Sequence, residues 1–256
     1  MEDCNFLLAL GRMSAGQERG CYLSMIKFIS LGPGAADMVT LGTLRFLKEA
    51  EKVYCFAVGN VSHAADILAE FDIDQNKVVR VDVPMSHDRS MANAVYDKLA
   101  LTLKQEHEEG KVIAVATEGD SSIFATTHYV MDRLVAMGVD CNQTPGVPSF
   151  IAAASVAGLH LVKLQERLLI IPGKTTADEI IRLTSQGYNL VIMKLSMAHE
   201  AVSEAFSKAN NQNFYYFENV GMPSQKYEIL KEIPNSFPYF SLMIISSPPP
   251  PEGGVL

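Results

Sequence analysis

A short apolar run that breaks into a Gly-Pro-Gly turn and then into a helical pattern is the feature that most limits how this chain can fold. The run covers residues 29–31, the turn covers residues 32–34, and helical periodicity follows over residues 38–50. Glycine allows unusual φ angles and close approach, so a strand, a glycine turn and a helix in this order bring main-chain atoms near a polar ligand. The segments TEGD (residues 117–120) and PGVPS (residues 145–149) follow two later apolar runs. Together these turns predict one composite site at the ends of three strands.

Apolar, β-branched runs alternate with helical periodicity over the first part of the chain. The expected strands are residues 25–31, 52–55, 77–83, 111–117 and 139–143, and the expected helices are residues 38–50, 63–71, 90–109 and 126–137. Such alternation requires crossover connections, which predicts a mostly parallel sheet. Residues 112–116 are apolar at every position, which is typical of a central strand that is buried on both faces.

The pattern changes after Pro148 and predicts a second α/β domain. The expected strands there are residues 167–171, 190–195, 214–217 and 240–245, the expected helices are residues 150–158, 177–186 and 198–209, and a turn is expected at residues 225–230. We therefore expect an N-terminal α/β domain over residues 25–147 and a C-terminal α/β domain over residues 148–247. Residues 1–24 are interpreted as a disordered extension before a functional start at Met25, and the proline-rich residues 248–256 as a disordered tail.

The charge balance and the positions of cysteine and histidine argue against several classes of function. The net charge is −8 and no long basic run occurs, which argues against a nucleic-acid partner. Four scattered cysteines form no CxxC pair and six histidines form no HxxxH pair, so no metal site is expected, and free thiols indicate a reducing, cytoplasmic location. No apolar run predicts a membrane span, and neither a GxSxG nor a P-loop motif occurs.

The three turns, taken in order, resemble the motifs of the tetrapyrrole methylases. The matching segments are residues 31–34 (LGPG), 118–120 (EGD) and 145–147 (PGV), and the resemblance covers residues 25–247. Residues 53–55, 59–65 and 118–129 look most like the precorrin-2 C(20)-methyltransferases of that family. The resemblance implies methyl transfer from S-adenosylmethionine to the C-20 meso carbon of precorrin-2, or of its cobalt complex, in cobalamin biosynthesis. It also implies two α/β domains with a cleft between them, and a homodimer.

The resemblance also implies where the cofactor would bind. The residues at the family's cofactor positions are Pro33, Gly34, Glu118, Gly119, Asp120, Ile123, Pro148, Ser149, Met193 and Gly221. By the same resemblance, residues 118–123 hold the methionine part of S-adenosylmethionine, and Met193 and Gly221 lie near its adenine and ribose. Contacts through the main chain explain why glycine and proline, rather than charged residues, dominate this set.

The chain departs from the family pattern at several positions. Ser30 replaces the first glycine of the first loop, and alanines at residues 35–36 replace an Asp-Pro pair. Cys55 stands where some relatives carry an aspartate that is implicated in proton removal. No catalytic base is therefore assigned.

A tetrapyrrole substrate carries several carboxylates, so an acidic protein has to present local cations or amide donors to bind it. The candidates are His87, Arg89, His128 and Lys194, with Lys163 and Arg167 as further basic side chains. Ordinary surface charge is the alternative interpretation of each of them.

Two other functions remain open at this point. One is another methylase of the same fold that acts at a different ring carbon or on a different substrate, such as diphthine or ribosomal RNA. The other is a non-catalytic protein that binds a tetrapyrrole or a nucleotide, which the altered first loop would favour. Whether the tetrapyrrole arrives metal-free or with cobalt is open as well.

Overall fold

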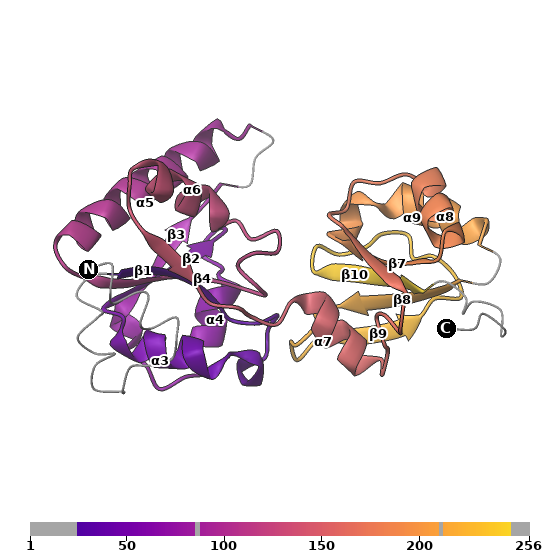
Figure 1. Ribbon diagram of the computed structural model, residues 1–256, viewed down its shortest axis with the longest axis horizontal. Coiled ribbons are helices and arrows are strands. Elements are labelled where there is room, and N and C mark those ends of the chain that lie inside the picture. Colours follow the sequence, from indigo (N-terminus) through magenta and orange to yellow (C-terminus); the bar gives the residue numbers. More distant parts are fainter. Residues whose placement is uncertain (1–24, 85–87, 210–211, 247–256) are drawn as a thin grey trace. The chain divides into compact units, whose positions relative to one another are not determined.

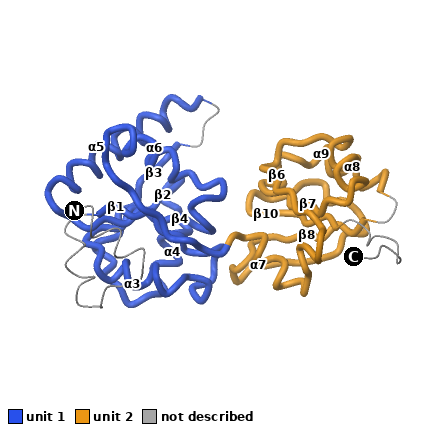
Figure 2. The backbone as a smooth tube through the Cα atoms, viewed as in Figure 1, with its two compact units in different colours: residues 1–147 blue, residues 148–256 orange. Residues whose placement is uncertain are grey.

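The computed structural model describes residues 25–84, 88–209 and 212–246 (Figure 1). The chain forms two compact units, Met1–Val147 and Pro148–Leu256, each with its own sheet (Figure 2). The disorder expected for residues 1–24 and 248–256, and the substrate candidate His87, lie outside the described residues.

Unit 1 contains a five-stranded sheet in the order β3-β2-β4-β1-β5, and all of its strand pairs are parallel. The strands are β1 (Met25–Ser30), β2 (Lys52–Ala57), β3 (Val78–Asp82), β4 (Val112–Thr117) and β5 (Cys141–Gln143). The central strand β4 is buried at five of its six positions, as its uninterrupted apolar sequence predicts. The expected parallel α/β sheet is thereby confirmed.

Helices cover both faces of this sheet (Figure 1). They are α3 (Leu41–Glu49), α4 (His63–Ala69), α5 (Ser90–Glu108) and α6 (His128–Ala136), with the short 3-10 turns η2 (Ala36–Met38) and η3 (Gln75–Lys77). Successive strand residues face opposite sides, so Ile29 packs with α3 and α4 while Phe28 packs with α5 and α6. Two apolar clusters result, one on each side of the sheet.

The helix expected from residue 38 begins later than the sequence pattern suggests. The side chain of Thr40 accepts a hydrogen bond from the amide of Thr43 at 3.2 Å, which caps α3 at its first turn. The residues before this cap form η2 instead of a continuous helix. A local side-chain cap therefore outweighs the helical periodicity of the preceding residues.

Unit 2 contains a mixed sheet in the order β6-β7-β10-β8-β9. Its strands are β6 (Arg167–Ile171), β7 (Tyr188–Met193), β8 (Asn213–Glu218), β9 (Lys226–Ile229) and β10 (Ser241–Ser246), and its helices are α7 (Ser149–Val156), α8 (Ala177–Ser185), α9 (His199–Ser207) and the 3-10 turn η4 (Leu195–Met197). Strands β6 and β7 are parallel, and β10 is antiparallel to both of its neighbours. The core of the unit joins β10 to α8 and α9.

The prediction of a turn at residues 225–230 is wrong. The segment forms β9, an edge strand that pairs antiparallel with β8. The sequence Lys-Tyr-Glu-Ile does alternate between polar and apolar residues, but only over four residues, which is the shortest run that indicates a strand, and all four are exposed. Main-chain pairing with β8 defines the strand, and across this pair the Tyr227 ring stacks on Phe217 and Lys226 pairs with Glu218.

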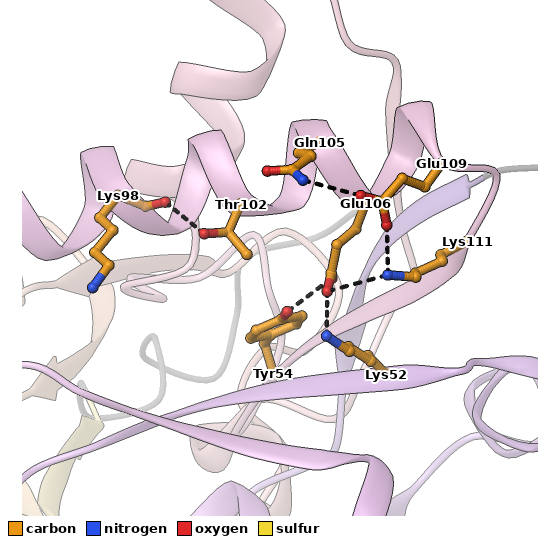
Figure 3. Close-up of polar contacts among 8 residues, drawn as sticks. All are labelled: Lys52, Tyr54, Lys98, Thr102, Gln105, Glu106, Glu109 and Lys111. Atoms are coloured by element: carbon orange, nitrogen blue, oxygen red, sulfur yellow. Dashed lines mark hydrogen bonds and ion pairs between the residues drawn. The ribbon is translucent and has the colours of Figure 1, made fainter.

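A buried ion cluster lies at the amino ends of β2 and β4 (Figure 3). Glu106 of α5 is 6% exposed and pairs with Lys52, the first residue of β2. Its carboxylate also accepts a hydrogen bond from the Tyr54 hydroxyl at 2.8 Å and lies 3.7 Å from the Lys111 ammonium. Burial raises the pKa of the Tyr54 hydroxyl. Its hydrogen bond to Glu106 and the negative charge of that carboxylate raise it further. The cluster ties α5 to the end of the sheet that is opposite the glycine turns.

Candidate functional site

The loops that follow β1 and β4 are joined to each other through two glycines. The amide of Gly32 donates to the carbonyl of Gly119 at 3.1 Å, and the amide of Gly119 donates to the carbonyl of Gly32 at 2.7 Å. Both residues have positive φ, +73° and +67°, a conformation that side-chain-bearing residues rarely adopt. The two turns that the sequence predicts separately therefore form one main-chain bridge at the carboxyl edge of the sheet.

The loop after β5 is tied to the same place by Asp120. Its carboxylate accepts hydrogen bonds from the amide of Gly146 at 2.6 Å and from the amide and hydroxyl of Ser122 at 2.8 and 2.5 Å. Partial burial acts to raise the pKa of Asp120, but these hydrogen bonds hold it below its ordinary value. The carboxylate is therefore ionised at neutral pH and fixes two of the three loops relative to each other.

Gly146 is packed against both of the other loops. A Cβ atom added to it would lie 2.4 Å from Cβ of Ser30 and 2.5 Å from the carbonyl oxygen of Gly119. Only glycine fits there without displacement of the main chain. By contrast, a Cβ added to Gly119 would meet nothing within 4 Å, so space is open above the main chain at that point.

A cluster of buried hydroxyl groups supports the three loops from beneath. The Ser30 hydroxyl donates to the carbonyl of Thr144 at 2.6 Å and accepts from the amide of Ser121 at 2.9 Å. The hydroxyls of Thr43 and Thr144 lie 2.8 Å apart, which connects α3 to the same cluster. Sequence reasoning treated Ser30 only as a departure from glycine. Its signal is a polar residue at the end of an apolar run, and the structure shows that this side chain, fully buried, links all three loops.

The cofactor positions expected from the resemblance fall into two sets, one in each unit. In unit 1, Gly119 and Asp120 belong to the loop cluster, Pro33 and Gly34 follow Gly32 directly, and the amide of Ile123 donates to the carbonyl of Asp120 at 3.1 Å. The structure therefore brings the first and second turns together as expected.

In unit 2, the expected residues lie at the ends of several elements. Pro148 and Ser149 begin α7, Met193 ends β7, and Gly221 follows β8 with a φ of +81°. Sequence reasoning missed Gly173, which follows β6. Its φ is +105°, and an added Cβ would lie 2.9 and 3.1 Å from the carbonyl oxygens of Lys194 and Met193. A Pro-Gly pair after an apolar run, here residues 172–173, is the signal that could have identified it.

The side chain of Glu118 is engaged within unit 1. Its carboxylate accepts a hydrogen bond from the amide of Ala64 and faces His63, both in α4. Burial is the largest cause of its raised pKa. A ligand at this position would therefore meet the main chain of residue 118 rather than a free carboxylate.

Cys55 lies fully buried within β2. Burial raises the pKa of its thiol to about 12, so the group stays protonated at neutral pH. It cannot take up a proton in place of the aspartate that some relatives carry.

Two of the four substrate candidates meet on one aromatic ring. The Arg89 guanidinium lies 5.3 Å from the centroid of the Tyr129 ring, and the His128 ring lies 4.1 Å from the same centroid. The third, Lys194, belongs to unit 2, where it takes a left-handed backbone conformation with a φ of 52°. Within the described residues, no three His, Cys, Asp or Glu side chains gather as metal ligands, and no helix is long and apolar enough to cross a membrane.

Solved methyltransferase structures share the fold of this chain. One, a cobalt precorrin-4 methyltransferase, superposes with a TM-score of 0.67 at 19% identity and covers 87% of this chain and 95% of its own. Another, the uroporphyrin-III C-methyltransferase of Thermus thermophilus complexed with S-adenyl homocysteine, gives a TM-score of 0.61 at 19% identity over 87% of this chain and 97% of its own. The chain therefore has the α/β fold of these solved structures.

Sequence comparison assigns the family within that fold. The profile of the Tetrapyrrole (Corrin/Porphyrin) Methylases matches residues 25–233. The chain belongs to the tetrapyrrole methylases, as its three motifs predict. It is 31% identical over 173 residues to the cobalt-precorrin-2 C(20)-methyltransferase of Salmonella typhimurium, which corresponds to 65% of this chain and 71% of that protein.

Proposed function

We propose that this protein transfers a methyl group from S-adenosylmethionine to the C-20 meso carbon of precorrin-2, or of its cobalt complex, in cobalamin biosynthesis. The observation that carries the proposal is the cluster of three loops joined through Gly32, Gly119 and Gly146 at the carboxyl edge of the unit 1 sheet. Ligands of open parallel sheets bind at this edge. The similarity to the Salmonella C(20)-methyltransferase favours C-20 as the ring position.

The described residues fit a cofactor that is held mainly by main-chain groups. The open space above Gly119 leaves room for a ligand against its main chain, and Asp120 keeps the surrounding loop rigid. When bound, S-adenosylmethionine would supply an electrophilic methyl group on a sulfonium. The residues proposed to hold it are those expected from the resemblance in both units, with Gly173 as an addition in unit 2.

Methyl transfer requires the protein chiefly to align the methyl donor with the acceptor carbon and to exclude water. The meso carbon is electron-rich, so it can attack the methyl carbon directly, and S-adenosylhomocysteine leaves as the S–CH3 bond breaks; no nucleophile from the protein is needed. Orientation of two reactants can lower a barrier by about 7–11 kcal/mol at most. Loops that are cross-linked by hydrogen bonds, as at Asp120, keep such an orientation with little rearrangement.

Gly119→Ala is expected to weaken cofactor binding by about tenfold or more, because the new methyl group would fill the space proposed for the ligand. Gly138→Ala is the matched control: its φ of +74° is close to the +67° of Gly119, and its added Cβ also meets nothing within 4 Å. Both variants should lose about 1–2 kcal/mol of stability from the left-handed conformation. Calorimetry with S-adenosylmethionine would contradict the proposal if the two variants bound equally well.

Arg89→Ala is expected to raise KM for the tetrapyrrole about fivefold, because a surface charge near a carboxylate contributes roughly 1 kcal/mol. The affinity for S-adenosylmethionine should not change, since Arg89 lies on Tyr129 rather than in the loop cluster. Arg45→Ala, which removes an exposed arginine from α3, is the control. An unchanged KM for Arg89→Ala would remove this residue from the substrate site.

The proposed reaction is tested by incubating the full chain with S-adenosylmethionine and with precorrin-2 or cobalt-precorrin-2. We expect one added methyl group by mass spectrometry and a methyl signal at C-20 by NMR when the donor methyl is isotopically labelled. A methyl at another ring carbon would favour the alternative within the family. Absence of cofactor binding at millimolar concentration would favour a non-catalytic protein. A homodimer and a cytoplasmic location stay predictions.

A further inference from the structure

A hollow of about 370 Å³ opens in unit 1 beside the first turn of α6. Its apolar wall consists of Phe28 from β1, Phe124 from the loop after β4, and Met131 from α6. Polar side chains, among them Thr127 and Gln143, line the remainder. The hollow adjoins the candidate cofactor loop, because Ser121 and Ser122 of that loop also line it.

Thr127 is the unusual polar residue of this hollow. It is 1% exposed, and within the described part of the chain its hydroxyl is buried without a hydrogen-bond partner. Buried hydroxyl groups are nearly always hydrogen-bonded, because an unpaired one loses its hydration without compensation. Thr127 is also one of the residues that line the hollow, so a ligand that enters beside it would supply the missing partner.

Further hydrogen-bond donors line the same hollow. The side-chain oxygen of Gln143 accepts from the Ser121 hydroxyl at 3.0 Å, which leaves the amide NH₂ of Gln143 for a ligand. Nδ1 of His128 contacts the carbonyl of Ala125 at 2.5 Å, which fixes the orientation of the ring on the lining of the hollow. Asp132, exposed, is the carboxylate among the lining residues.

The aromatic side of the hollow is held by a strained residue. Phe124 has a φ of +52° and is 41% exposed, although bulky residues rarely adopt the left-handed conformation. A turn closed by the hydrogen bond from the amide of Ile123 to the carbonyl of Asp120 precedes it. An apolar wall opposite polar donors is suited to a short chain of methylenes that ends in an acceptor group.

We propose that this hollow binds one carboxylate side chain of the tetrapyrrole substrate, a step that rests on the proposed function. The methylenes would lie against Phe28, Phe124 and Met131, and the carboxylate would accept hydrogen bonds from Thr127 and Gln143. The adjacent Arg89, which stacks on the same Tyr129 ring as His128, adds positive charge near this side of the unit. Thr127 is thereby a substrate-positioning residue that selects for a carboxylate at one place on the ring.

Thr127→Val tests the proposal, because valine keeps the shape of threonine and removes only the hydroxyl. Its neighbour Thr126 is exposed and does not line the hollow, so Thr126→Val is the matched control. The probe is uroporphyrin, a stable octacarboxylate macrocycle, titrated into the full-length protein and followed by its absorbance. We expect about tenfold weaker binding for Thr127→Val, as for loss of a hydrogen bond to a charged acceptor, and no change for Thr126→Val.

Two further measurements separate this proposal from the proposed function. S-adenosylmethionine affinity and the unfolding temperature of Thr127→Val should match those of the wild type, since no internal hydrogen bond is lost. If the wild type methylates precorrin-2 and both valine variants keep its KM and its uroporphyrin affinity, the hollow is not a substrate site although the function holds. Suppose instead that the wild type binds uroporphyrin, that Thr127→Val binds it more weakly as expected, and that the wild type transfers no methyl group. The hollow is then a tetrapyrrole site, but the proposed reaction is wrong. No binding of uroporphyrin by the wild type would overturn the hollow.

Discussion

Gly146→Ala is expected to lower the affinity for S-adenosylmethionine by roughly 100-fold and the free energy of unfolding by about 2–4 kcal/mol. The added Cβ would lie 2.4 Å from Cβ of Ser30 and 2.5 Å from the carbonyl oxygen of Gly119. Neither atom can move away as a flexible side chain would, because Ser30 is fully buried and Gly119 is bound to Gly32. The loop after β5 must therefore shift, which breaks its hydrogen bond to Asp120.

The matched control is Gly42→Ala in α3. There an added Cβ has a single neighbour within 4 Å, the Thr40 hydroxyl oxygen at 3.9 Å, so nothing has to move. Alanine is also the better helix former, and stability should stay equal or rise slightly. Calorimetric titration and urea unfolding measure the two effects. Wild-type cofactor affinity in Gly146→Ala would show that the three loops do not form the binding site.

Glu106→Ala is expected to lower the free energy of unfolding by about 1–3 kcal/mol, because it leaves the buried hydroxyl of Tyr54 without its acceptor. Tyr54, which is 5% exposed, would lose its hydrogen bond, and Lys52 and Lys111 would lose the carboxylate that they share. The affinity for S-adenosylmethionine should stay the same in the folded protein. The cluster (Figure 3) lies at the amino end of the sheet, whereas the loops of the candidate site follow the carboxyl ends of its strands.

Glu108→Ala provides the control for this prediction. Glu108 belongs to the same helix, but its side chain is 59% exposed and its partner Lys104 is on the helix surface. Exposed pairs of this kind contribute at most about 0.5 kcal/mol. The urea unfolding midpoints of the two variants should therefore differ clearly. Equal midpoints would show that the buried cluster adds no stability beyond that of a surface pair.

The local features of this chain could be predicted from its residues. The apolar residues 112–116 predicted a central parallel strand, and β4 lies in the middle of the sheet and is buried. Local sequence patterns predicted the structure less well where strand pairing or helix capping determines an element or its first residue. The alternation in β9 is only four residues long and all four are exposed, and the cap at Thr40 delays α3 until Leu41.

The hollow beside α6 could not be foreseen from the residues that line it. Phe28, Thr127 and Gln143 are far apart in the sequence, and each is ordinary in its own segment. The hollow forms because β1 and β5 are neighbours in the sheet and α6 packs on the same face as Phe28. The missing partner of the Thr127 hydroxyl becomes visible only when its whole surroundings are known.

The amino-acid sequence by itself determined the α/β class, the three glycine turns at strand ends and the family, because each depends on residues that are close together in the chain. The tertiary structure decided how those turns are joined. Strand β1 lies between β4 and β5, so its loop is adjacent to both of the others, and the Ser30 hydroxyl can reach the carbonyl of Thr144 and the amide of Ser121. Strand order in a sheet is set by the packing of whole elements, which no short segment of sequence encodes.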